Sequence, residues 1–291
     1  MNYPNSVGEL TQDLRQGSYL ADRGLATAVF VALSLQRPIL LEGEVGVGKT
    51  EIAKVLASVY GRELIRLQCY EGIDTNQALY EWDYARQLLH IRALSERDVT
   101  DEEAVEKLFG PKFLLERPLL RAIRAGDQAV LLIDEVDRAD DEFEAFLLEL
   151  LSDFQISIPE VGTIKAERAP LVVLTSNRTR ELHDALKRRC MYHWIGYPAP
   201  DREVEIVTVR EPGVSRALAR KVVEAVNRLR EMDLAKPPGV AETIDWARTL
   251  DFLGETELTP DVAEITLGSV VKERDDLDLV RDNLEEVTSG A

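Results

Sequence analysis

The sequence has few cysteines and no long apolar run. Two cysteines among 291 residues cannot build a disulfide framework, so a reducing compartment is expected. No run approaches the roughly 20 apolar residues that a helix needs to span a bilayer. The first residues lack the basic and then apolar pattern of a secretory signal. These absences predict a cytoplasmic protein without membrane insertion.

Basic residues are also scarce. The chain carries 35 Lys and Arg residues against 53 Asp and Glu residues, which gives a formal net charge of −18. Because binding to nucleic-acid phosphates needs a basic footprint, this charge argues against nucleic acid as a partner. Hydrophobic residues at 45% and charged residues at 30% are typical of a globular protein with a substantial core.

Short apolar runs alternate with longer amphipathic segments in the first two thirds of the chain. This pattern predicts βαβ units, and continuous apolar runs are typical of buried parallel strands. Apolar residues at helical spacing between 143 and 151 predict one of the intervening helices, with Asp140 as its N-cap. The fold class is therefore α/β with a five-stranded parallel sheet. The predicted strands are residues 38–41, 64–67, 129–133, 171–174 and 192–195.

Two segments depart from this alternation. Alternating runs at 154–159 and 163–166 flank a glycine-containing turn and predict a β-hairpin. Beyond a proline-containing linker only helical patterns follow. The sequence therefore predicts an αβ core over residues 1–199 and an all-α lid domain over residues 200–291. The acidic tail at 272–286 is expected to be a solvated helix face or a frayed end.

Residues 43–50 fit the pattern G-x-x-x-x-G-K-[ST] and lie between a predicted strand and a predicted helix. Glycines let the backbone fold around an anion, and the helix adds the positive end of its dipole. Lys49 could reach the β- and γ-phosphates of ATP, and Thr50 could supply a hydroxyl to Mg²⁺. The alternative, a glycine-rich turn that binds nothing, is disfavoured because both flanking elements are present. The predicted nucleotide-binding residues are Gly43, Glu44, Val45, Gly46, Val47, Gly48, Lys49, Thr50 and Glu51.

A pair of acids, Asp134 and Glu135, follows the apolar strand at 129–133. Open α/β sheets bind ligands at the carboxyl ends of their strands. Asp134 is predicted to hold Mg²⁺ directly or through water, and Glu135 to take a proton from the water that attacks the γ-phosphate. A plain helix start is the alternative. The upstream phosphate loop favours the catalytic interpretation, because a nucleotide with Mg²⁺ needs a carboxylate here.

Two later motifs extend the predicted site. Asn177 follows a strand and could orient the attacking water or the γ-phosphate, although such an Asn is commonly a turn residue. Arg188 and Arg189 end a basic cluster that could act in a neighbouring subunit as an arginine finger, with Arg189 favoured. Arginine suits this role because its guanidinium is always charged and binds phosphate oxygens in a fork. A solvated helix end beside its negative dipole is the alternative.

The order of these parts resembles the AAA+ ATPases, and finer details are similar to the MoxR branch. Residues 134–139 resemble the D-E-[IV]-N-R-A motif of that branch, with Asp137 in place of Asn. Residues 146–151, followed by the predicted hairpin, are similar to its A-L-L-E-x-M segment and pre-sensor hairpin. Segments at 67–74, 79–87 and 182–190 look like the CoxD-type members, which are associated with carbon monoxide dehydrogenase maturation.

The resemblance implies a homo-oligomeric ring, expected to be a hexamer, that binds ATP and Mg²⁺ between subunits and hydrolyses ATP. It also implies a chaperone role in maturing a metalloenzyme, with a partner that carries a von Willebrand factor A domain. For CoxD-type proteins the client would be a molybdenum hydroxylase whose cluster needs sulfur and copper. Two alternatives stay open: a nucleotide-dependent assembly scaffold with little hydrolysis, and a DNA-directed AAA+ ATPase, which the net charge disfavours.

Three other features are weighed from the sequence. MoxR-like lids often carry an arginine as a second nucleotide sensor, but residues 239–243 contain none, and Arg248 farther along the predicted helix is a candidate substitute. Trp82 either faces a partner or packs beneath the insertion between the second and third strands. Structural roles are favoured over zinc binding for three residues that fit no zinc motif: His183, Cys190 and His193.

Overall fold

A computed structural model describes residues 3–94, 110–159 and 161–289. The described chain forms two compact units. The first contains the residues up to Asp13, Ala21–Glu42 and Ala53–His193. The second contains Leu14–Leu20, Gly43–Ile52 and the residues from Trp194 onward.

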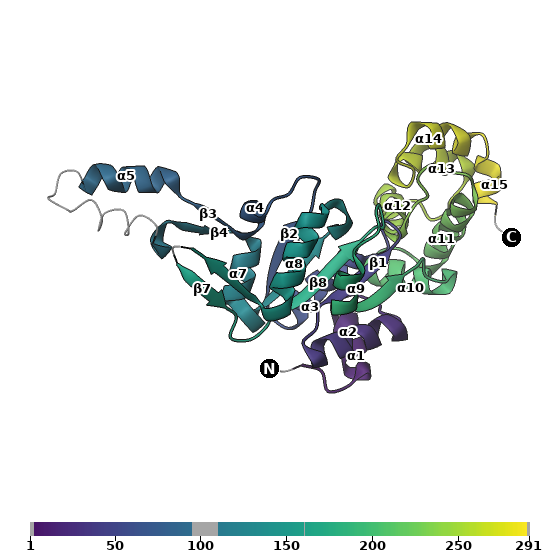
Figure 1. The fold of residues 1–291 in the computed structure, drawn as a ribbon. Coiled ribbons are helices and arrows are strands. Elements are labelled where there is room, and N and C mark those ends of the chain that lie inside the picture. The colour runs from purple at the N-terminus through teal and green to yellow at the C-terminus, as the bar shows by residue number, and fades with distance from the viewer. Residues whose placement is uncertain (1–2, 95–109, 160, 290–291) are drawn as a thin grey trace. The chain divides into compact units, whose positions relative to one another are not determined.

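A five-stranded parallel sheet forms the centre of the first unit, with the strand order β2-β5-β8-β1-β9 (Figure 1). Every residue of β1, β5 and β8 is buried, as expected from their continuous apolar sequences. The expected five strands are therefore confirmed, each within two residues of its predicted ends. The strands are β1 (Ile39–Gly43), β2 (Glu63–Gln68), β5 (Ala129–Asp134), β8 (Leu171–Ser176) and β9 (Met191–Ile195).

Helices with one apolar face cover this sheet. In α8 the side chain of Asp140 accepts a hydrogen bond from the backbone N–H of Phe143, which confirms the predicted N-cap. The helix α7 packs against β2 and β5, and its Leu119 and Ile123 are buried in the core of this unit. The helices from the N-terminus to β9 are α1 (Val7–Gln16), α2 (Arg23–Leu35), α3 (Lys49–Val59), α4 (Thr75–Leu79), α5 (Tyr84–Leu94), α7 (Pro118–Ala125), α8 (Asp141–Asp153) and α9 (Asp184–Arg189), with short 3₁₀ turns at η1 (Pro111–Phe113), η2 (Gly126–Gln128) and η3 (Val136–Arg138).

Two antiparallel strand pairs lie outside the central sheet. The predicted hairpin is confirmed as β6 (Gln155–Ile158) paired with β7 (Gly162–Lys165). The second pair, β3 (Tyr80–Trp82) with β4 (Leu114–Glu116), was not predicted, because each strand has only three residues and 31 residues (83–113) separate them in the chain. This pair holds together the insertion between β2 and α7 (Figure 1).

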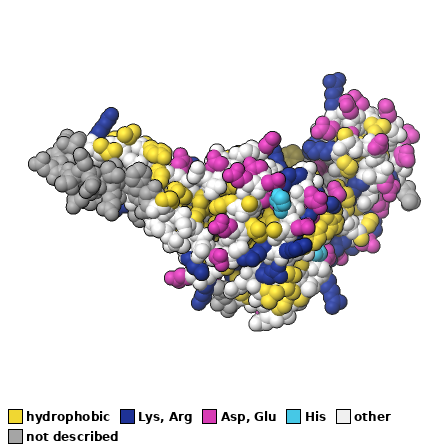
Figure 2. All heavy atoms as spheres, viewed as in Figure 1, with side chains coloured by type: hydrophobic (Ala, Val, Ile, Leu, Met, Phe, Trp, Pro, Cys, Tyr) yellow, Lys and Arg dark blue, Asp and Glu magenta, His cyan; other side chains and the backbone are white. Residues whose placement is uncertain are grey.

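The aromatic residues of the insertion differ in exposure. Trp82 is only 8% exposed and packs in the core of the unit, so it stabilises the insertion from within. Tyr84, by contrast, is 61% exposed at the start of α5. Leu88 and Leu89 are also exposed on α5, and Figure 2 shows hydrophobic side chains on the surface of this helix. Of the two alternatives for Trp82, packing is therefore the one that the structure favours.

The C-terminal part of the second unit is all-α, as expected. Its core contains the fully buried Trp246 and the apolar faces of α10, α11 and α12. The acidic tail forms helices whose Val280 and Val287 pack in this core. Asp276 is buried as well, whereas the other acids of the tail are exposed to solvent. These helices are α10 (Pro200–Arg210), α11 (Arg216–Glu231), α12 (Val240–Leu253), α13 (Pro260–Thr266), η4 (Leu267–Ser269), α14 (Arg274–Arg281) and α15 (Leu284–Thr288). Within the described chain, no helix combines the length and apolar character needed to cross a membrane.

Candidate functional site

The phosphate loop connects β1 to the start of α3. Its Gly46 and Gly48 have φ angles of +76° and +90°, which favour glycine because other residues rarely adopt them. The buried Lys49 turns back into the loop, where Nζ donates to the carbonyl oxygens of Gly43 at 2.8 Å and Glu44 at 2.5 Å. The loop backbone thus fixes the position of its own ammonium group.

The start of α12 is bonded to this loop within the second unit. The backbone N–H of Ala241 donates to the carbonyl oxygen of Gly46 at 3.0 Å. A Cβ at Gly239 would lie 2.6 Å from the carbonyl oxygen of Val45, so only glycine allows this approach. Glu242 closes the contact by accepting the Gly239 N–H at 2.9 Å. The stretch that lacks the expected sensor arginine is therefore the stretch that contacts the phosphate loop.

Two arginines of the lid helices differ in their partners. Arg248, the candidate substitute for the missing sensor, pairs with Glu211 and Asp245. Arg210 instead pairs with Glu51 at 2.9 Å, one residue after the loop. Sequence reasoning missed Arg210, because no local pattern links the last turn of α10 to a residue 159 positions earlier (210 − 51).

A buried ion pair supports the segment that precedes α12. Arg230 forms a fork with Glu203, with N–O distances of 2.7 and 2.8 Å, and Glu203 is 0% exposed. Thr243 donates to the same carboxylate at 2.7 Å. The Nε of Arg230 donates to the carbonyl oxygen of Pro238, and its guanidinium lies 4.3 Å from the centre of the Tyr197 ring. These contacts fix the residues next to Gly239.

The acid pair lies at the carboxyl end of β5 in the first unit. Asp134 is buried and accepts from Thr175 and from Arg66, both at 2.5 Å. The backbone N–H of Glu135 donates to the same Thr175 hydroxyl at 2.9 Å. Glu135 has a φ of +54°, a left-handed backbone that costs a non-glycine residue energy and persists because its surroundings hold it there. Arg138 pairs with the Glu135 carboxylate at 3.1 Å.

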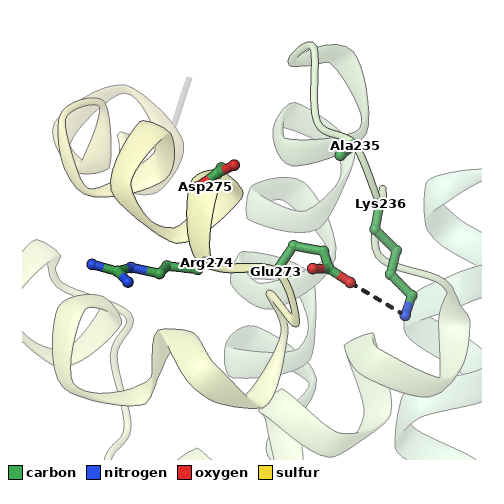
Figure 3. A pocket seen from close by; sticks show the side chains of 5 residues that line it. All are labelled: Ala235, Lys236, Glu273, Arg274 and Asp275. Atoms are coloured by element: carbon green, nitrogen blue, oxygen red, sulfur yellow. Dashed lines mark ion pairs between the residues drawn. The ribbon is translucent and has the colours of Figure 1, made fainter.

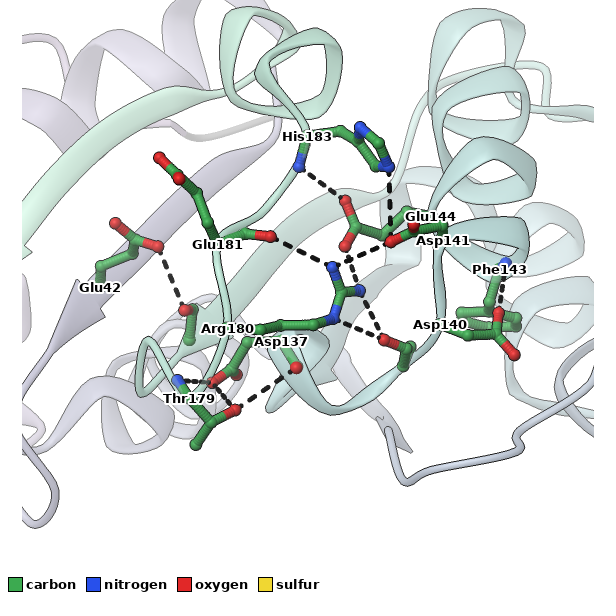
Figure 4. A network of polar contacts seen from close by, with 12 residues as sticks. Glu42, Asp137, Asp140, Asp141, Phe143, Glu144, Thr179, Arg180, Glu181 and His183 are labelled. Carbon is green, nitrogen blue, oxygen red and sulfur yellow. Dashed lines mark hydrogen bonds and ion pairs between the residues drawn. The ribbon is translucent and has the colours of Figure 1, made fainter.

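Asn177 directly follows β8, the neighbour of β5 in the sheet. Its backbone N–H donates to the buried carboxylate of Asp137, which also accepts from the backbone and side chain of Thr179 (Figure 4). Sequence reasoning noted Asp137 only as a departure from a motif. The structure brings Asp134, Glu135 and Asn177 to one edge of the sheet, where the parallel strands β5 and β8 end.

The segment after Asn177 leads to the predicted arginine finger through a second polar cluster. Arg180 donates to the carbonyl oxygen of Ala139 and pairs with the buried Glu144 (Figure 4). Glu144 also accepts the backbone N–H of His183, the N-cap residue of α9. The last turn of α9 presents Arg188 and Arg189 to solvent, while Arg37 donates to their backbone carbonyls. Their role as an arginine finger stays a prediction.

The other candidate sites in the described part of the chain are two cysteines, possible metal-ligand groups and one pocket, and none has the features of a functional site. Burial raises the pKa of the Cys69 and Cys190 thiols to about 12, so at neutral pH neither is a ready thiolate ligand. Among the residues that the structure describes, no three His, Cys, Asp or Glu side chains are grouped to hold a metal ion. A depression of about 270 Å³ beside the start of α14 is lined by charged residues, including the Lys236–Glu273 ion pair (Figure 3). Its lining is unlike the apolar walls of most small-molecule sites.

The residues present fit a magnesium nucleotide. Positive φ angles at Gly46 and Gly48 give the loop the backbone shape that turns N–H groups toward an anion. Mg²⁺ prefers oxygen ligands, and the two predicted ligands, Thr50 and the buried Asp134, would offer a hydroxyl and a carboxylate. Gly43–Glu51 and the acid pair fall in different units, so their joint action on one nucleotide stays a prediction.

Comparison with known proteins identifies the family. The sequence model of the AAA domain (dynein-related subfamily) matches residues 38–190. Protein NorQ of Paracoccus denitrificans is 27% identical over 216 residues, which cover 72% of this chain and 70% of NorQ. Protein CbbQ of Hydrogenophilus thermoluteolus is 27% identical over 225 residues, covering 75% and 73%. Chaperone protein ClpB 2 of Nostoc is 28% identical over 59% of this chain and 16% of ClpB 2.

Proposed function

Since the chain belongs to the AAA domain family, dynein-related subfamily, we propose that it couples ATP hydrolysis to the remodelling of a client metalloenzyme. It is a MoxR-like AAA+ ATPase related to NorQ and CbbQ, which confirms the resemblance drawn from its sequence. As an AAA+ ATPase it uses ATP and Mg²⁺ and hydrolyses ATP. The remodelling role and the client are the proposal.

The contact between α12 and the phosphate loop carries this proposal. The backbone of Ala241 donates to the loop carbonyl of Gly46, and Glu242 accepts from Gly239, which packs against the loop. A change in the loop at the phosphates therefore acts directly on a lid helix. Remodelling requires such a link, because a nucleotide can move only those elements whose contacts differ between its bound states. We infer that residues 1–199 form the nucleotide-binding core and that residues 200–291 form the lid that responds.

Each site residue has a role in hydrolysis under this proposal. Lys49 and the loop amides bind the phosphates, while Thr50 and Asp134 would hold Mg²⁺, which would supply positive charge to the phosphate oxygens. Glu135 takes the proton of the attacking water, and Asn177 orients that water or the γ-phosphate. In a ring of identical subunits, Arg189, with Arg188 as second choice, reaches the nucleotide of the neighbour and stabilises the charge that develops there.

The proposed client is a molybdenum hydroxylase. Support comes from the segments at 67–74, 79–87 and 182–190, which resemble CoxD-type proteins. The chaperone name of a relative, ClpB 2, is consistent with a remodelling role. In this proposal the ring is a hexamer, and a partner with a von Willebrand factor A domain links it to the client.

Glu135→Gln tests the proposal, because it keeps the shape of the side chain and removes the base. We expect ATP binding to be retained and steady-state hydrolysis to fall by about 10²- to 10⁴-fold. With ATP and Mg²⁺, the variant should then retain a purified apo molybdenum hydroxylase that the wild type releases. Lys49→Ala is the matched control, which should neither bind ATP nor retain the client.

The outcomes separate the alternatives. If wild type and Glu135→Gln hydrolyse ATP at the same rate, Glu135 is not the catalytic base. That result would favour the alternative of a scaffold that assembles on ATP with little hydrolysis. If Glu135→Gln loses hydrolysis as expected but does not retain the hydroxylase, the protein is an ATPase whose client belongs to another class. Salt-sensitive DNA binding would favour the DNA-directed alternative, against the net charge of −18.

A further inference from the structure

The backbone around Asn177 is held in an unusual conformation. Asn177 lies between Ser176, the last residue of β8, and Arg178, whose φ of +57° is left-handed. A non-glycine residue in this region costs energy and persists only when its surroundings hold it there. The contacts that hold these residues therefore decide where the Asn177 side chain is placed.

Asp137 holds one side of this turn. It is 1% exposed, and one carboxylate oxygen, Oδ2, accepts from the backbone N–H of Asn177 at 3.2 Å. The same oxygen accepts from the backbone N–H and the hydroxyl of Thr179, each at 2.8 Å (Figure 4). Oδ1 has no hydrogen-bond partner among the described residues, so the contacts that satisfy this carboxylate all come from the Asn177–Thr179 turn. Asp137 lies two residues after Glu135 and thus ties the turn to the acid pair.

Glu42 holds the other side. It is 4% exposed at the end of β1, and its Oε1 accepts from the hydroxyl of Ser176 at 3.1 Å (Figure 4). That hydroxyl in turn accepts the backbone N–H of Arg178 at 3.1 Å. The hydroxyl of Tyr192, on β9, also hydrogen-bonds to Glu42. Glu42 is the residue directly before the phosphate loop, so this chain of contacts ties the turn to β1.

We propose that Glu42 and Asp137 are positioning residues that hold the backbone of Asn177 from both sides for ATP hydrolysis. The inference rests on the proposed role of Asn177 in orienting the attacking water or the γ-phosphate. Both carboxylates act through the turn, since their hydrogen bonds go to its backbone and hydroxyl groups. The D-E-[IV]-N-R-A motif has Asn at the position of Asp137, and the amide of Asn also has an oxygen that accepts hydrogen bonds. A carboxylate accepts stronger hydrogen bonds than an amide oxygen because it is charged.

A double-mutant cycle with Asn177 tests this assignment in the full chain. We expect Asp137→Ala to lower kcat for ATP hydrolysis by about 10- to 100-fold, with KM for ATP changed less than about 3-fold, because misplacement affects the reacting geometry more than binding. Asn177→Ala should lower kcat to a similar extent. The double variant Asp137→Ala/Asn177→Ala should be no slower than Asn177→Ala, since the positioned side chain is already gone.

Conservative and matched variants complete the test. Asp137→Asn and Glu42→Gln keep an accepting oxygen and should recover most of kcat. Asp276→Ala is the matched control, because Asp276 is also a buried carboxylate that accepts two backbone N–H groups, those of Ala235 and Lys236, but it lies in the lid. Its kcat should stay near that of the wild type.

The results that would overturn the inference are distinct from failure of the proposed function. If Asn177→Ala hydrolyses ATP like the wild type, the proposed role of Asn177 and this inference fall together. If Asn177→Ala is impaired but Asp137→Ala adds its full loss in that background, only the positioning role falls. Should Asp137→Ala not fold, Ser176→Ala carries the test. It removes the hydroxyl that links Glu42 to Arg178, and the same non-additive loss is expected.

Discussion

Arg230→Met is expected to destabilise the lid helices strongly. The substitution removes the positive partner of Glu203, whose carboxylate is fully buried, and leaves a charge without its counter-ion. Methionine keeps much of the apolar volume of the arginine stem, so the loss is mainly electrostatic. Because the pair sits beside the Pro238–Gly239 segment, the variant also loosens the support of the phosphate-loop contact.

The magnitude follows from the contacts of the pair. Breaking a buried ion pair by removing one partner costs about 3–5 kcal/mol. Loss of the hydrogen bond from Arg230 to the Pro238 carbonyl adds about 1 kcal/mol. In the double variant Arg230→Met/Glu203→Met no buried charge remains, so most of the loss should be recovered. The exposed pair between Arg220 and Asp201 is the matched comparison, and Arg220→Met should cost no more than about 1 kcal/mol.

Hydrogen exchange of α11 and α12, followed by mass spectrometry at increasing urea, measures the local free energy of unfolding in the full chain. A loss below about 1 kcal/mol in Arg230→Met would contradict the reasoning, since it would mean that Glu203 is readily solvated or neutralised. A double variant as unstable as the single one would also contradict it, because the cause would then be packing rather than the unpaired charge.

Two further substitutions test the loop and the ring. Gly239→Ala places a Cβ against the carbonyl oxygen of Val45 and should weaken ATP affinity by at least about 10-fold in calorimetry, because backbone must move. Gly268→Ala, where no atom lies within 4 Å of the added Cβ, should leave the affinity unchanged. Arg189→Ala should retain nucleotide binding and lose about 10³-fold in turnover. Activity should return on mixing with Lys49→Ala subunits, and no recovery would assign Arg189 a structural role.

The sheet could be predicted from the sequence because each buried strand is a continuous apolar run. Val130 to Ile133 is an example: four apolar residues are followed directly by Asp134, so both the strand and its functional end are visible. The phosphate loop was equally clear, since its glycines, lysine and threonine are local in sequence. The β3–β4 pair escaped prediction because its strands are short and distant in the chain.

The supporting residues of the site could not be predicted for a different reason. Glu42, Asp137 and Thr175 act through partners that lie 134, 40 and 41 positions away in the chain. Only the sheet order, which places β8 between β1 and β5, brings these partners together. Arg210 and Glu51 likewise meet only in the folded second unit. The residue type at one position does not reveal which distant residue it will contact in the fold.

The hydrogen bonds of Lys49 have a consequence for selectivity among anions. Its ammonium group donates to the carbonyl oxygens of Gly43 and Glu44, so these bonds fix the position of the lysine charge at the loop. A single small anion can accept few hydrogen bonds from donors at fixed positions. A triphosphate chain has many charged oxygens and can engage the ammonium and the loop amides at once. A lysine held in this way is therefore expected to favour ligands with several phosphates over a single small anion.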